Sequence, residues 1–387
     1  MIVNLHIYPS PFKFESRIIR ESNTLLDDRL VDKIIIASAW ANGLARKEYI
    51  DSRIEIRRFR TLSDRLLRFH KIFLASKYIE LYLYISFFYL FKKVDVVNAH
   101  SLMVLPIGVF LRKFKGKVKL IYDAHELETE RFGLKGFAKK TSKKLEQLLI
   151  KSCDRIIVVG NYIRKWYIEE YSLSENHIYT VRNLNSDRTG ELSSRNVYFE
   201  EFFNFEPKDI IFIYQGLLSD GRGIDVYIET FKKLPKNYKL VLMGYGPLEK
   251  HIKNVCETSD NIVFHPAVKP SEIVSVTSSA HVGLSLIENY CLSYYYSLPN
   301  KLFEYANSGL TIIGSKFPEM EEVIKNNEIG WVIEPNANEL FMLISGKGFD
   351  EEIASLSGNI SSFNSRFNWV TEQRHLIEAY KSLNLKN

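Results

Sequence analysis

Short apolar runs recur along the whole chain, and a longer segment with helical spacing follows most of them. The first half contains six such runs, at residues 2–8, 33–38, 54–59, 94–100, 117–125 and 154–160. The second half contains six more, at residues 210–216, 238–244, 261–265, 281–288, 310–314 and 330–334. Strands buried in a parallel sheet have continuous apolar sequences, and crossover helices join them. The alternation therefore predicts an α/β protein with two successive doubly wound units.

A polar stretch separates the two series. Around residues 185–207 the sequence passes through NSDRTGELSSRN and then FEP, which is typical of a linker. The chain of 387 residues is long enough for two domains, which we place at residues 1–190 and 191–366. We expect the last segment, residues 367–387, to form a helix that packs back on the first domain. Ligands of such domains bind outside the carboxyl ends of the strands.

Charge is distributed unevenly between the two halves. Residues 1–190 hold 34 Lys and Arg against 21 Asp and Glu, a net +13, whereas residues 191–387 hold 18 against 25, a net −7. A basic first half suits an anionic partner, such as a membrane surface, a nucleic acid or a phosphate-bearing substrate. Basic residues are not interleaved with aromatic ones as in RNA-binding modules, so we expect no nucleic acid partner.

Several common sites are absent from the sequence. The three cysteines, Cys153, Cys256 and Cys291, form no CxxC or Cys/His cluster, so we expect no disulfide framework, no zinc site and a reducing cytoplasm. The N-terminus lacks the basic start and long apolar core of a signal peptide. There is no Walker A motif, no GxGxxG after the first strand and no GxSxG. There is also no Asp-x-Asp, which disfavours a carboxylate-held metal.

The stretch SLPNKLFEYANSGLTIIG, residues 297–314, predicts a short helix followed by a buried strand. Asn300, Lys301 and Glu304 would share one face of that helix. Free amides at a helix start suit an anion, and a carboxylate accepts protons from hydroxyl groups. This combination is what a nucleotide diphosphate with its ribose needs. The alternative is an ordinary amphipathic helix with a solvated Lys–Glu pair.

Three further strand ends carry candidate residues. GLLSDGRGID holds Gly216 and Arg222, and Arg offers a planar fork to phosphate oxygens. MGYGP holds Gly244 and Gly246, a tight turn where a base or a ribose fits. YDAHE places His125 at a strand end of the first domain. The alternatives are a glycine-rich turn with an exposed Arg and a structural His.

Two segments of the first domain invite a comparison with membrane helices. Residues 72–93 are rich in Tyr, Phe and Leu, but Lys77 and Glu80 interrupt them, so a spanning helix is not expected. The segment could lie in a membrane interface or cover the sheet as a core helix. Residues 136–152 bring several lysines close together, which suits either a solvated face or anionic lipid.

With these residues in place, the chain resembles the family 4 glycosyltransferases of group 1, retaining enzymes of the GT-B fold. The matching pieces are YQGLLSDGRGID, LVLMGYGPLEKHI and LPNKLFEYANSGLTIIGS, together with the final helix. The resemblance implies two Rossmann-like domains, with the acceptor on the first and the nucleotide-sugar donor on the second.

The resemblance also assigns roles to residues. Arg222 would contact the donor diphosphate, Gly216 would lie under the transferred sugar, and Glu304 would bind the ribose hydroxyls. Backbone amides near Asn300, Lys301 and Leu302 would face the diphosphate. His125 would lie beside the transferred sugar.

The sequence departs from the family pattern at two points. The first glutamate of the family's pair is replaced by Tyr296, and Glu288 is our candidate for the same role. Leu217 replaces the basic residue that often follows Gly216, and Lys301 would supply that charge.

The resemblance implies a metal-independent enzyme, without a cofactor, that moves a sugar from a UDP-sugar with retention. The acceptor would be a glycan or a lipid-linked molecule of surface polysaccharide assembly, at a membrane that the basic domain contacts from the cytoplasm. The alternatives are a non-hydrolysing nucleotide-sugar epimerase and a binding protein without catalysis.

Overall fold

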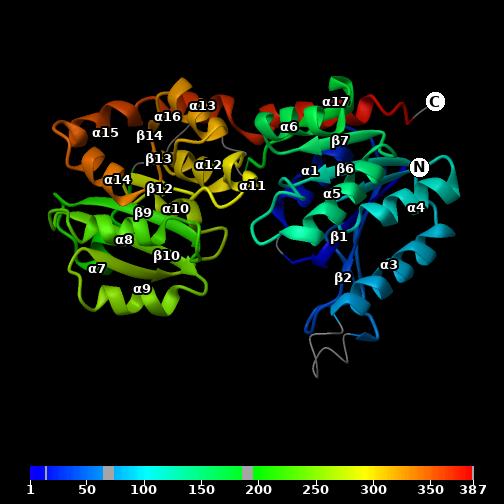
Figure 1. The fold of residues 1–387 in the computed structure, drawn as a ribbon, viewed down its shortest axis with the longest axis horizontal. Coiled ribbons are helices and arrows are strands. Elements are labelled where there is room, and N and C mark those ends of the chain that lie inside the picture. Colours follow the sequence, from blue (N-terminus) through cyan, green and yellow to red (C-terminus); the bar gives the residue numbers. More distant parts are fainter. Residues whose placement is uncertain (14, 64–73, 185–194, 386–387) are drawn as a thin grey trace. The chain divides into compact units, whose positions relative to one another are not determined.

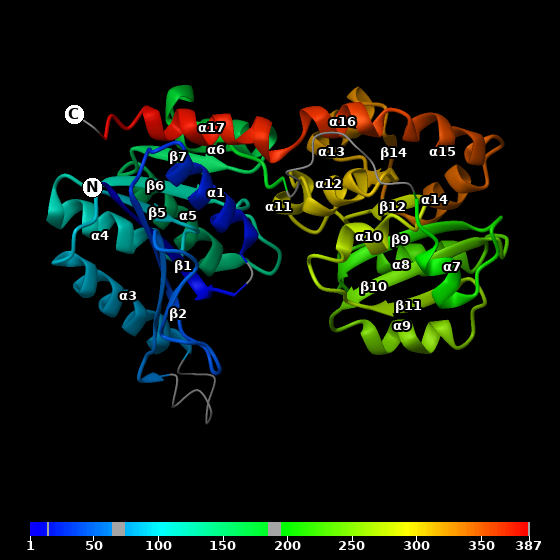
Figure 2. The ribbon, with the colours of Figure 1, turned by 180° about the vertical axis from the view of Figure 1, so that it is seen from behind.

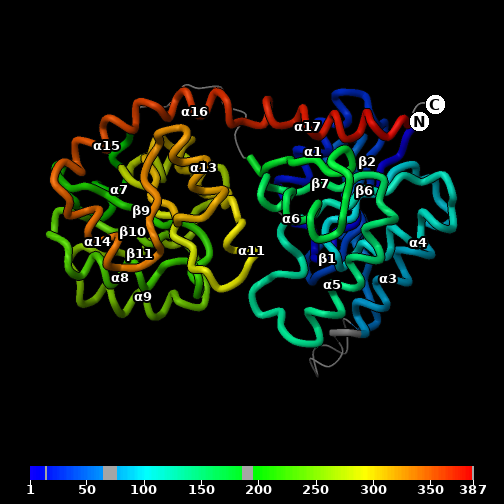
Figure 3. The backbone as a smooth tube through the Cα atoms, turned by 45° about the horizontal axis from the view of Figure 1, so that its top comes forward, coloured from blue at the N-terminus to red at the C-terminus, as the bar shows by residue number. Residues whose placement is uncertain are grey.

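The structure is a computed structural model that describes residues 1–13, 15–63, 74–184 and 195–385. The chain forms two compact units, which Figures 1 and 2 show from opposite sides. Unit 1 comprises Met1–Asn183 and Glu372–Asn387, and unit 2 comprises Leu184–Thr371. The end of the chain thus returns to the first unit, as Figure 3 shows where α16 runs into α17.

Unit 1 is built on an eight-stranded sheet in the order β3-β4-β2-β1-β5-β6-β7-β8. The strands are β1 (Val3–Pro11), β2 (Lys33–Ala39), β3 (Lys47–Tyr49), β4 (Ile54–Phe59), β5 (Val96–Ala99), β6 (Lys119–Ala124), β7 (Arg155–Val158) and β8 (Ile178–Thr180). Only β3 pairs antiparallel among these described strands. The chain order reverses between β1 and β5, which is where such sheets open a crevice at their carboxyl ends.

The described helices of unit 1 pack on this sheet. They are α1 (Ser16–Asp27), α3 (Leu74–Leu90), α4 (Leu105–Lys115), α5 (Gly136–Ile150), α6 (Asn161–Tyr171) and the greater part of α17 (Trp369–Lys381), with a short 3-10 turn at Glu175–His177. Tyr380 anchors α17, because its hydroxyl donates to Asn98 Oδ1 at 2.8 Å and accepts from Asn4 Nδ2 at 2.7 Å. The last helix is therefore bonded to the strands β1 and β5.

Unit 2 has a six-stranded parallel sheet in the order β11-β10-β9-β12-β13-β14. The strands are β9 (Ile210–Leu217), β10 (Tyr238–Tyr245), β11 (Ile262–Pro266), β12 (Val282–Ser285), β13 (Thr311–Ser315) and β14 (Gly330–Ile333). The helices are α7 (Tyr198–Phe203), α8 (Ile224–Phe231), α9 (Glu249–Cys256), α10 (Ile273–Thr277), α11 (Leu292–Tyr295), α12 (Asn300–Asn307), α13 (Pro318–Asn326), α14 (Ala337–Ile344), α15 (Phe349–Ser357) and α16 (Ile360–Arg366). The order reverses between β9 and β12, so the expected binding crevice lies there.

Two hydrophobic clusters hold unit 2 together, one on each face of its sheet. Ile211 and Ile213 of β9 face one cluster, and Phe212 and Tyr214 face the other. Both faces of β9 are covered by helices, which explains why residues 210–214 are continuously apolar or aromatic. The packing on both faces holds the strands in place, and their carboxyl ends lie along one edge of the sheet.

The predicted fold class is confirmed, because each of the twelve predicted runs contains or overlaps a strand of two α/β sheets. Within the described residues, no helix is both long and apolar enough to cross a bilayer. The segment predicted at residues 72–93 corresponds to α3, although residues 72 and 73 lie outside the described part of the chain. Leu81, Ile85 and Tyr89 are buried, so α3 does cover the sheet.

Candidate active site

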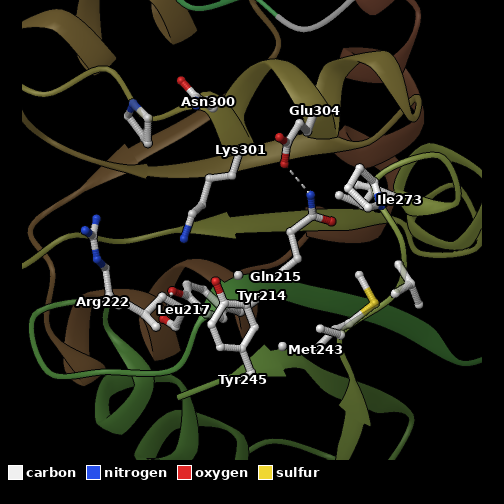
Figure 4. Close-up of a pocket in the computed structure, with 16 residues that line it drawn as sticks. Tyr214, Gln215, Leu217, Arg222, Met243, Tyr245, Ile273, Asn300, Lys301 and Glu304 are labelled. Atoms are coloured by element: carbon white, nitrogen blue, oxygen red, sulfur yellow. Dashed lines mark hydrogen bonds between the residues drawn. The ribbon is translucent and has the colours of Figure 1, made fainter. Parts of the chain in front are cut away.

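A pocket of about 520 Å³ lies at the carboxyl ends of β9 and β10 in unit 2 (Figure 4). Its polar side chains are Tyr214, Gln215, Arg222, Tyr245, Asn300, Lys301 and Glu304. Its apolar side chains include Met243, Ala267, Val268, Pro270 and Ile273. Arg222 and Lys301 lie at one end of the pocket and Met243 and Ile273 at the other. The volume is within the usual range for small-molecule sites.

The first turn of α12 delivers Lys301 to this pocket. Pro299 is the extended N-cap residue, and the helix begins at Asn300, within the stretch where the sequence predicts a short helix. The Lys301 ammonium lies over the Tyr214 ring, with Nζ 3.9 Å from the ring centroid. Burial and the Arg222 guanidinium lower the pKa of Lys301 to about 7, and the Glu304 carboxylate opposes that shift. The polar end of the pocket thus holds two cationic groups that repel each other.

Glu304, one turn further along α12, is fixed by a neighbour from β9. Gln215 Nε2 donates to Glu304 Oε2 at 2.7 Å, as the dashed line in Figure 4 marks. Gln215 Oε1 accepts a hydrogen bond from Thr277 Oγ1 at 2.6 Å, which fixes the orientation of the amide. The carboxylate is therefore held in place at the wall of the pocket.

The remaining start of α12 contributes less side-chain surface. Asn300 lines the pocket and is exposed. Leu302 does not line it, because its side chain is fully buried in the core and its amide already donates to Pro299 O at 3.1 Å. Of the three amides predicted to face an anion, that of Leu302 is thus already used within the first turn.

The three candidate glycines have different roles. Gly216 lines the pocket, and a Cβ added there would lie 3.8 Å from Lys301 Nζ. Gly244 also lines it, but its added Cβ would approach Gly216 O to 1.9 Å, so this glycine is needed for the close approach of β9 and β10. Gly246 is not among the lining residues, and its backbone packs against Leu218 O.

Arg222 comes from the glycine-rich loop after β9, and tyrosines of the 290–296 segment support that loop. The Arg222 guanidinium lies 5.0 Å from the Tyr294 ring centroid. A Cβ at Gly221 would meet the rings of Tyr290 and Tyr294, each at 3.1 Å. Glu288 does not line the pocket, but its amide donates to Gly221 O at 3.2 Å.

The unmatched segment YCLSYYY thus packs directly behind the candidate phosphate-binding Arg. Tyr296, which replaces the family's first glutamate, ends α11 and is half-buried. Its ring centroid lies 5.2 Å from that of Tyr295.

The remaining candidate, His125, belongs to unit 1 and lies at the carboxyl end of β6. Its Nε2 is 3.4 Å from Asp123 Oδ2 and 3.2 Å from His100 Nδ1. His100 Nε2 in turn accepts from or donates to His6 Nδ1 at 2.8 Å. Three histidines, one inside β1 and two directly after β5 and β6, therefore form a continuous chain, of which only His125 is appreciably exposed.

Asp123 is the charged centre of this chain. It is buried, and Arg17 NH2 contacts its Oδ1 at 3.1 Å. Burial alone would raise the pKa of the Asp123 carboxyl, but Arg17, His125 and His100 together hold that pKa well below its usual range. Burial lowers the pKa of His100, so we expect it to be neutral and to donate from Nδ1 to Asp123. The network orients the partly exposed imidazole of His125.

Among the described residues, the two groups of side chains that are spaced like metal ligands both belong to this cluster. Ligand atoms of His100, Asp123 and His125 lie within 4.8 Å of one another, as do those of His6, Glu21 and His100. Arg17 NH2 contacts Asp123 Oδ1, which places a fixed cation where a metal would compete for the same carboxylate.

Comparisons with known protein families match each of the two units separately. The family described as "Glycosyl transferases group 1" matches residues 199–343, and "Glycosyltransferase Family 4" matches residues 23–184. The chain belongs to the family 4 glycosyltransferases of group 1. The predicted family is thereby confirmed.

Solved structures agree with this glycosyltransferase in fold. Sucrose-phosphate synthase from Thermosynechococcus elongatus has a TM-score of 0.80 at 14% identity, with 100% of both chains covered. The Anabaena protein HepE in complex with UDP-glucose has a TM-score of 0.73 at 12% identity, covering 99% of this chain and 100% of that one. At these identities the likeness concerns the two-domain GT-B fold.

Curated relatives of the glycosyltransferase are more similar in sequence. Chitobiosyldiphosphodolichol beta-mannosyltransferase from Candida albicans is 22% identical over 310 residues, which is 73% of this chain and 67% of the relative. The enzyme of the same name from Candida glabrata is 23% identical over 266 residues, 61% of this chain and 58% of the relative. The chain thus spans between about half and two thirds of the length of these relatives.

The sequence analysis did not identify several residues of the pocket in unit 2 and of the histidine chain in unit 1. Gln215 lies inside a predicted strand, and His6 and His100 lie in or beside predicted strands of the first unit. Gln215 and His100 lie at the carboxyl ends of apolar-rich runs, which is the signal that could have identified them, whereas His6 lies inside its run.

Proposed function

We propose that this glycosyltransferase moves a hexose from a UDP-sugar to a glycan or lipid-linked acceptor, with retention at the anomeric carbon and without a metal ion. The observation that carries the proposal is the pairing of Arg222 and Lys301 with Glu304 in one pocket. A diphosphate needs cationic donors, and a ribose needs an acceptor for its hydroxyl protons. The spacing along α12 offers both within one turn.

The other end of the pocket suits a nucleobase. Met243, Val268 and Ile273 present apolar surface against which a base can pack. A donor molecule would therefore lie with its base among these residues, its ribose at Glu304 and its diphosphate between Arg222 and Lys301. The sugar would then point towards Gly216, where the absence of a side chain leaves space.

Charge stabilisation is the catalytic contribution that we assign to this unit. When the glycosidic bond breaks, the departing diphosphate gains negative charge. Two preorganised cations at that position stabilise the transition state more than the ground state. Such groups are typically worth about 10²–10³ in kcat each. On this proposal they replace a metal ion, and an excess of chelator should leave the rate unchanged.

Retention is proposed from the family resemblance, and the carboxylates of the pocket bear on how it would proceed. Glu304 is the one acidic side chain among the described residues that line it, and Gln215 holds it at the proposed ribose position. No second carboxylate is then available as the covalent nucleophile of a retaining hydrolase. We propose a front-face reaction in which the leaving phosphate helps to deprotonate the acceptor. The anomeric configuration of the product, read by NMR, tests this point directly.

The acceptor side rests on the first unit. The curated relatives carry a lipid diphosphate in their names, which supports a lipid-linked acceptor here. The net +13 of residues 1–190 supports contact with an anionic membrane from the cytoplasm. We place the reaction in surface polysaccharide assembly, and we propose that His125 lies beside the transferred sugar.

A nucleotide-sugar panel tests the function. Turnover of UDP-hexoses with and without acceptor should be followed for the wild type and for Arg222→Ala and Glu304→Ala. We expect each variant to lose about 10²–10³ in kcat/KM, because one proposed donor contact is removed. Arg366→Ala and Glu257→Ala, which change exposed residues of the same unit, are the matched controls.

Three outcomes would contradict the proposal. Wild-type rates in both site variants would remove Arg222 and Glu304 from the site. Conversion of a UDP-sugar to its epimer without acceptor would favour an epimerase. Binding without any turnover across the panel, donor hydrolysis included, would leave a binding protein.

A further inference from the structure

The outer face of α3 in unit 1 exposes a line of large apolar side chains, which we call the α3 stripe. It consists of Ile79, Leu83, Phe87 and Phe91, which are 62%, 49%, 56% and 83% exposed. The positions are four apart, so they follow one face of the helix and its C-terminal end. Leu81, Ile85 and Tyr89 alternate with them and are buried. The helix is therefore apolar on two opposite faces, and only one of them is covered by the described chain.

The apolar surface continues onto α4. The two helices pack against each other and lie side by side in both ribbon views (Figures 1 and 2). The Phe87 and Phe110 ring centroids are 6.2 Å apart, and those of Phe110 and Phe114 are 4.5 Å apart. Phe114 is 63% exposed. An exposed apolar patch of this kind on a folded domain marks an interaction site.

Lysines surround one end of the patch. Residues 76–93 and 103–117 hold seven Lys or Arg and one acidic residue, Glu80. The Glu80 carboxylate is engaged by Ser63, whose amide donates to it at 3.2 Å. Lys92 and Lys93 directly follow Phe91, and all three are exposed. Lys115 Nζ donates to Leu90 O and Lys92 O at 2.9 and 2.8 Å, which ties the ends of α3 and α4 together.

We propose that the α3 stripe and Phe114 dock this protein on an anionic lipid surface. Apolar side chains flanked by lysines match the interface of a bilayer, where acyl chains lie beneath phosphate groups. The helix lies on the surface and does not cross it, because its opposite face is buried in unit 1. The inference rests on the proposed lipid-linked acceptor, and it identifies the face by which the first unit reaches that acceptor.

A second copy of the chain is the competing occupant. A two-fold contact through the same patch would bring Lys92, Lys93 and Lys113 of both copies towards one another. Like charges in a shared interface oppose association, whereas anionic headgroups attract them. The charge around the patch therefore favours lipid.

Vesicle sedimentation tests the proposal. The full chain is mixed with vesicles of phosphatidylcholine alone or with one third phosphatidylglycerol, and the pelleted fraction is measured. We expect binding to the anionic vesicles, weakened by salt. Ile79→Ser/Phe91→Ser should lower the apparent affinity at least tenfold, and Lys92→Glu/Lys93→Glu should do the same for anionic vesicles only. These side chains are exposed, so the variants should fold.

The matched control is Tyr49→Ser/Ile50→Ser at the end of β3, which removes two large side chains that are 53% and 47% exposed in the same unit. We expect its vesicle binding to equal that of the wild type. Equal binding by the stripe variant, or an equal loss in the control, would overturn the proposal. The proposal would also be overturned if the wild type failed to bind vesicles and light scattering showed it to be a dimer. In that case the stripe variant would be a monomer.

Donor turnover separates this proposal from the proposed function. The stripe variant should hydrolyse a UDP-sugar in solution at the wild-type rate. If the wild type binds vesicles but turns over no donor, the enzymatic proposal fails and the docking surface stands. If it turns over donor but ignores vesicles, the docking surface fails alone.

Discussion

On the proposed function, Lys301 makes donor affinity depend on pH. With its pKa lowered to about 7, the amine is largely neutral above pH 7 in the free protein. A bound diphosphate favours the ammonium form and therefore raises this pKa. Donor affinity is then fully present below pH 7, and it falls as pH rises, by up to tenfold per pH unit, until the pKa of the complex is reached.

Calorimetric titration with a UDP-sugar between pH 6 and pH 9 checks this expectation. A UDP-sugar has no phosphate proton to lose in that range, so the protein provides the pH dependence. Lys301→Arg keeps its charge throughout and should bind with a nearly constant affinity. Lys301→Met should bind weakly at every pH. A wild-type affinity that does not change between pH 6 and pH 9 would show that Lys301 is not in contact with the diphosphate.

The sequence identified the charged residues of the pocket but not their supports. Arg222, Lys301 and Glu304 stand in loops or on a helix face, where a charge suggests a ligand. Gln215 looks like an ordinary strand residue, because its role depends on Thr277, which is far away in the sequence. Contacts of this kind depend on which strands and helices become neighbours, and local spacing does not contain that information.

At the level of strands, long apolar runs were predictable and short edge strands were not. The strand β3 has three exposed residues, Lys47–Tyr49, so it carries no burial pattern. The strand β8 is also only three residues long, Ile178–Thr180. Similarly, α3 is apolar on two faces, and its sequence does not indicate which of them packs against the sheet. Only the packing of α3 separates the buried residues from the α3 stripe.

We expect that Gly244, where β9 and β10 approach each other closely, cannot be replaced by a residue with a side chain without a loss of stability. Gly244 has φ of +155°, and an added Cβ would lie 1.9 Å from Gly216 O. In Gly244→Ala the two strand ends must separate, which we expect to cost about 1–3 kcal/mol of stability and to weaken donor binding by displacing Gly216. Denaturant unfolding and UDP titration measure the two effects.

Gly358→Ala is the control for this substitution. Its added Cβ would lie 3.4 Å from Ser355 O, an ordinary contact, at the end of α15. We expect a stability within about 0.5 kcal/mol of the wild type and unchanged UDP affinity. If Gly244→Ala behaves like this control, the strand ends are more yielding than their backbone spacing implies.

The division into two units has a thermodynamic consequence that two tyrosines can reveal. The Tyr380 hydroxyl joins Asn4 and Asn98 in unit 1, and the Tyr305 hydroxyl joins the Gln215 amide and Leu284 O in unit 2. Both side chains are buried. Each Tyr→Phe change removes two buried hydrogen bonds with almost no change in volume, so each should cost its own unit about 1–3 kcal/mol.

Differential scanning calorimetry with and without UDP distinguishes the units. UDP contacts only residues of unit 2 in our assignment, and at 100 times its Kd it should stabilise that unit by about 2.7 kcal/mol. We therefore expect the transition that Tyr305→Phe lowers to be the one that UDP raises, and the transition that Tyr380→Phe lowers to stay where it is. If UDP raised the Tyr380-sensitive transition instead, nucleotide would bind to unit 1 or couple the units. The same scan shows with which unit α17 unfolds, because Tyr380 is one of the α17 residues that bond to the first unit.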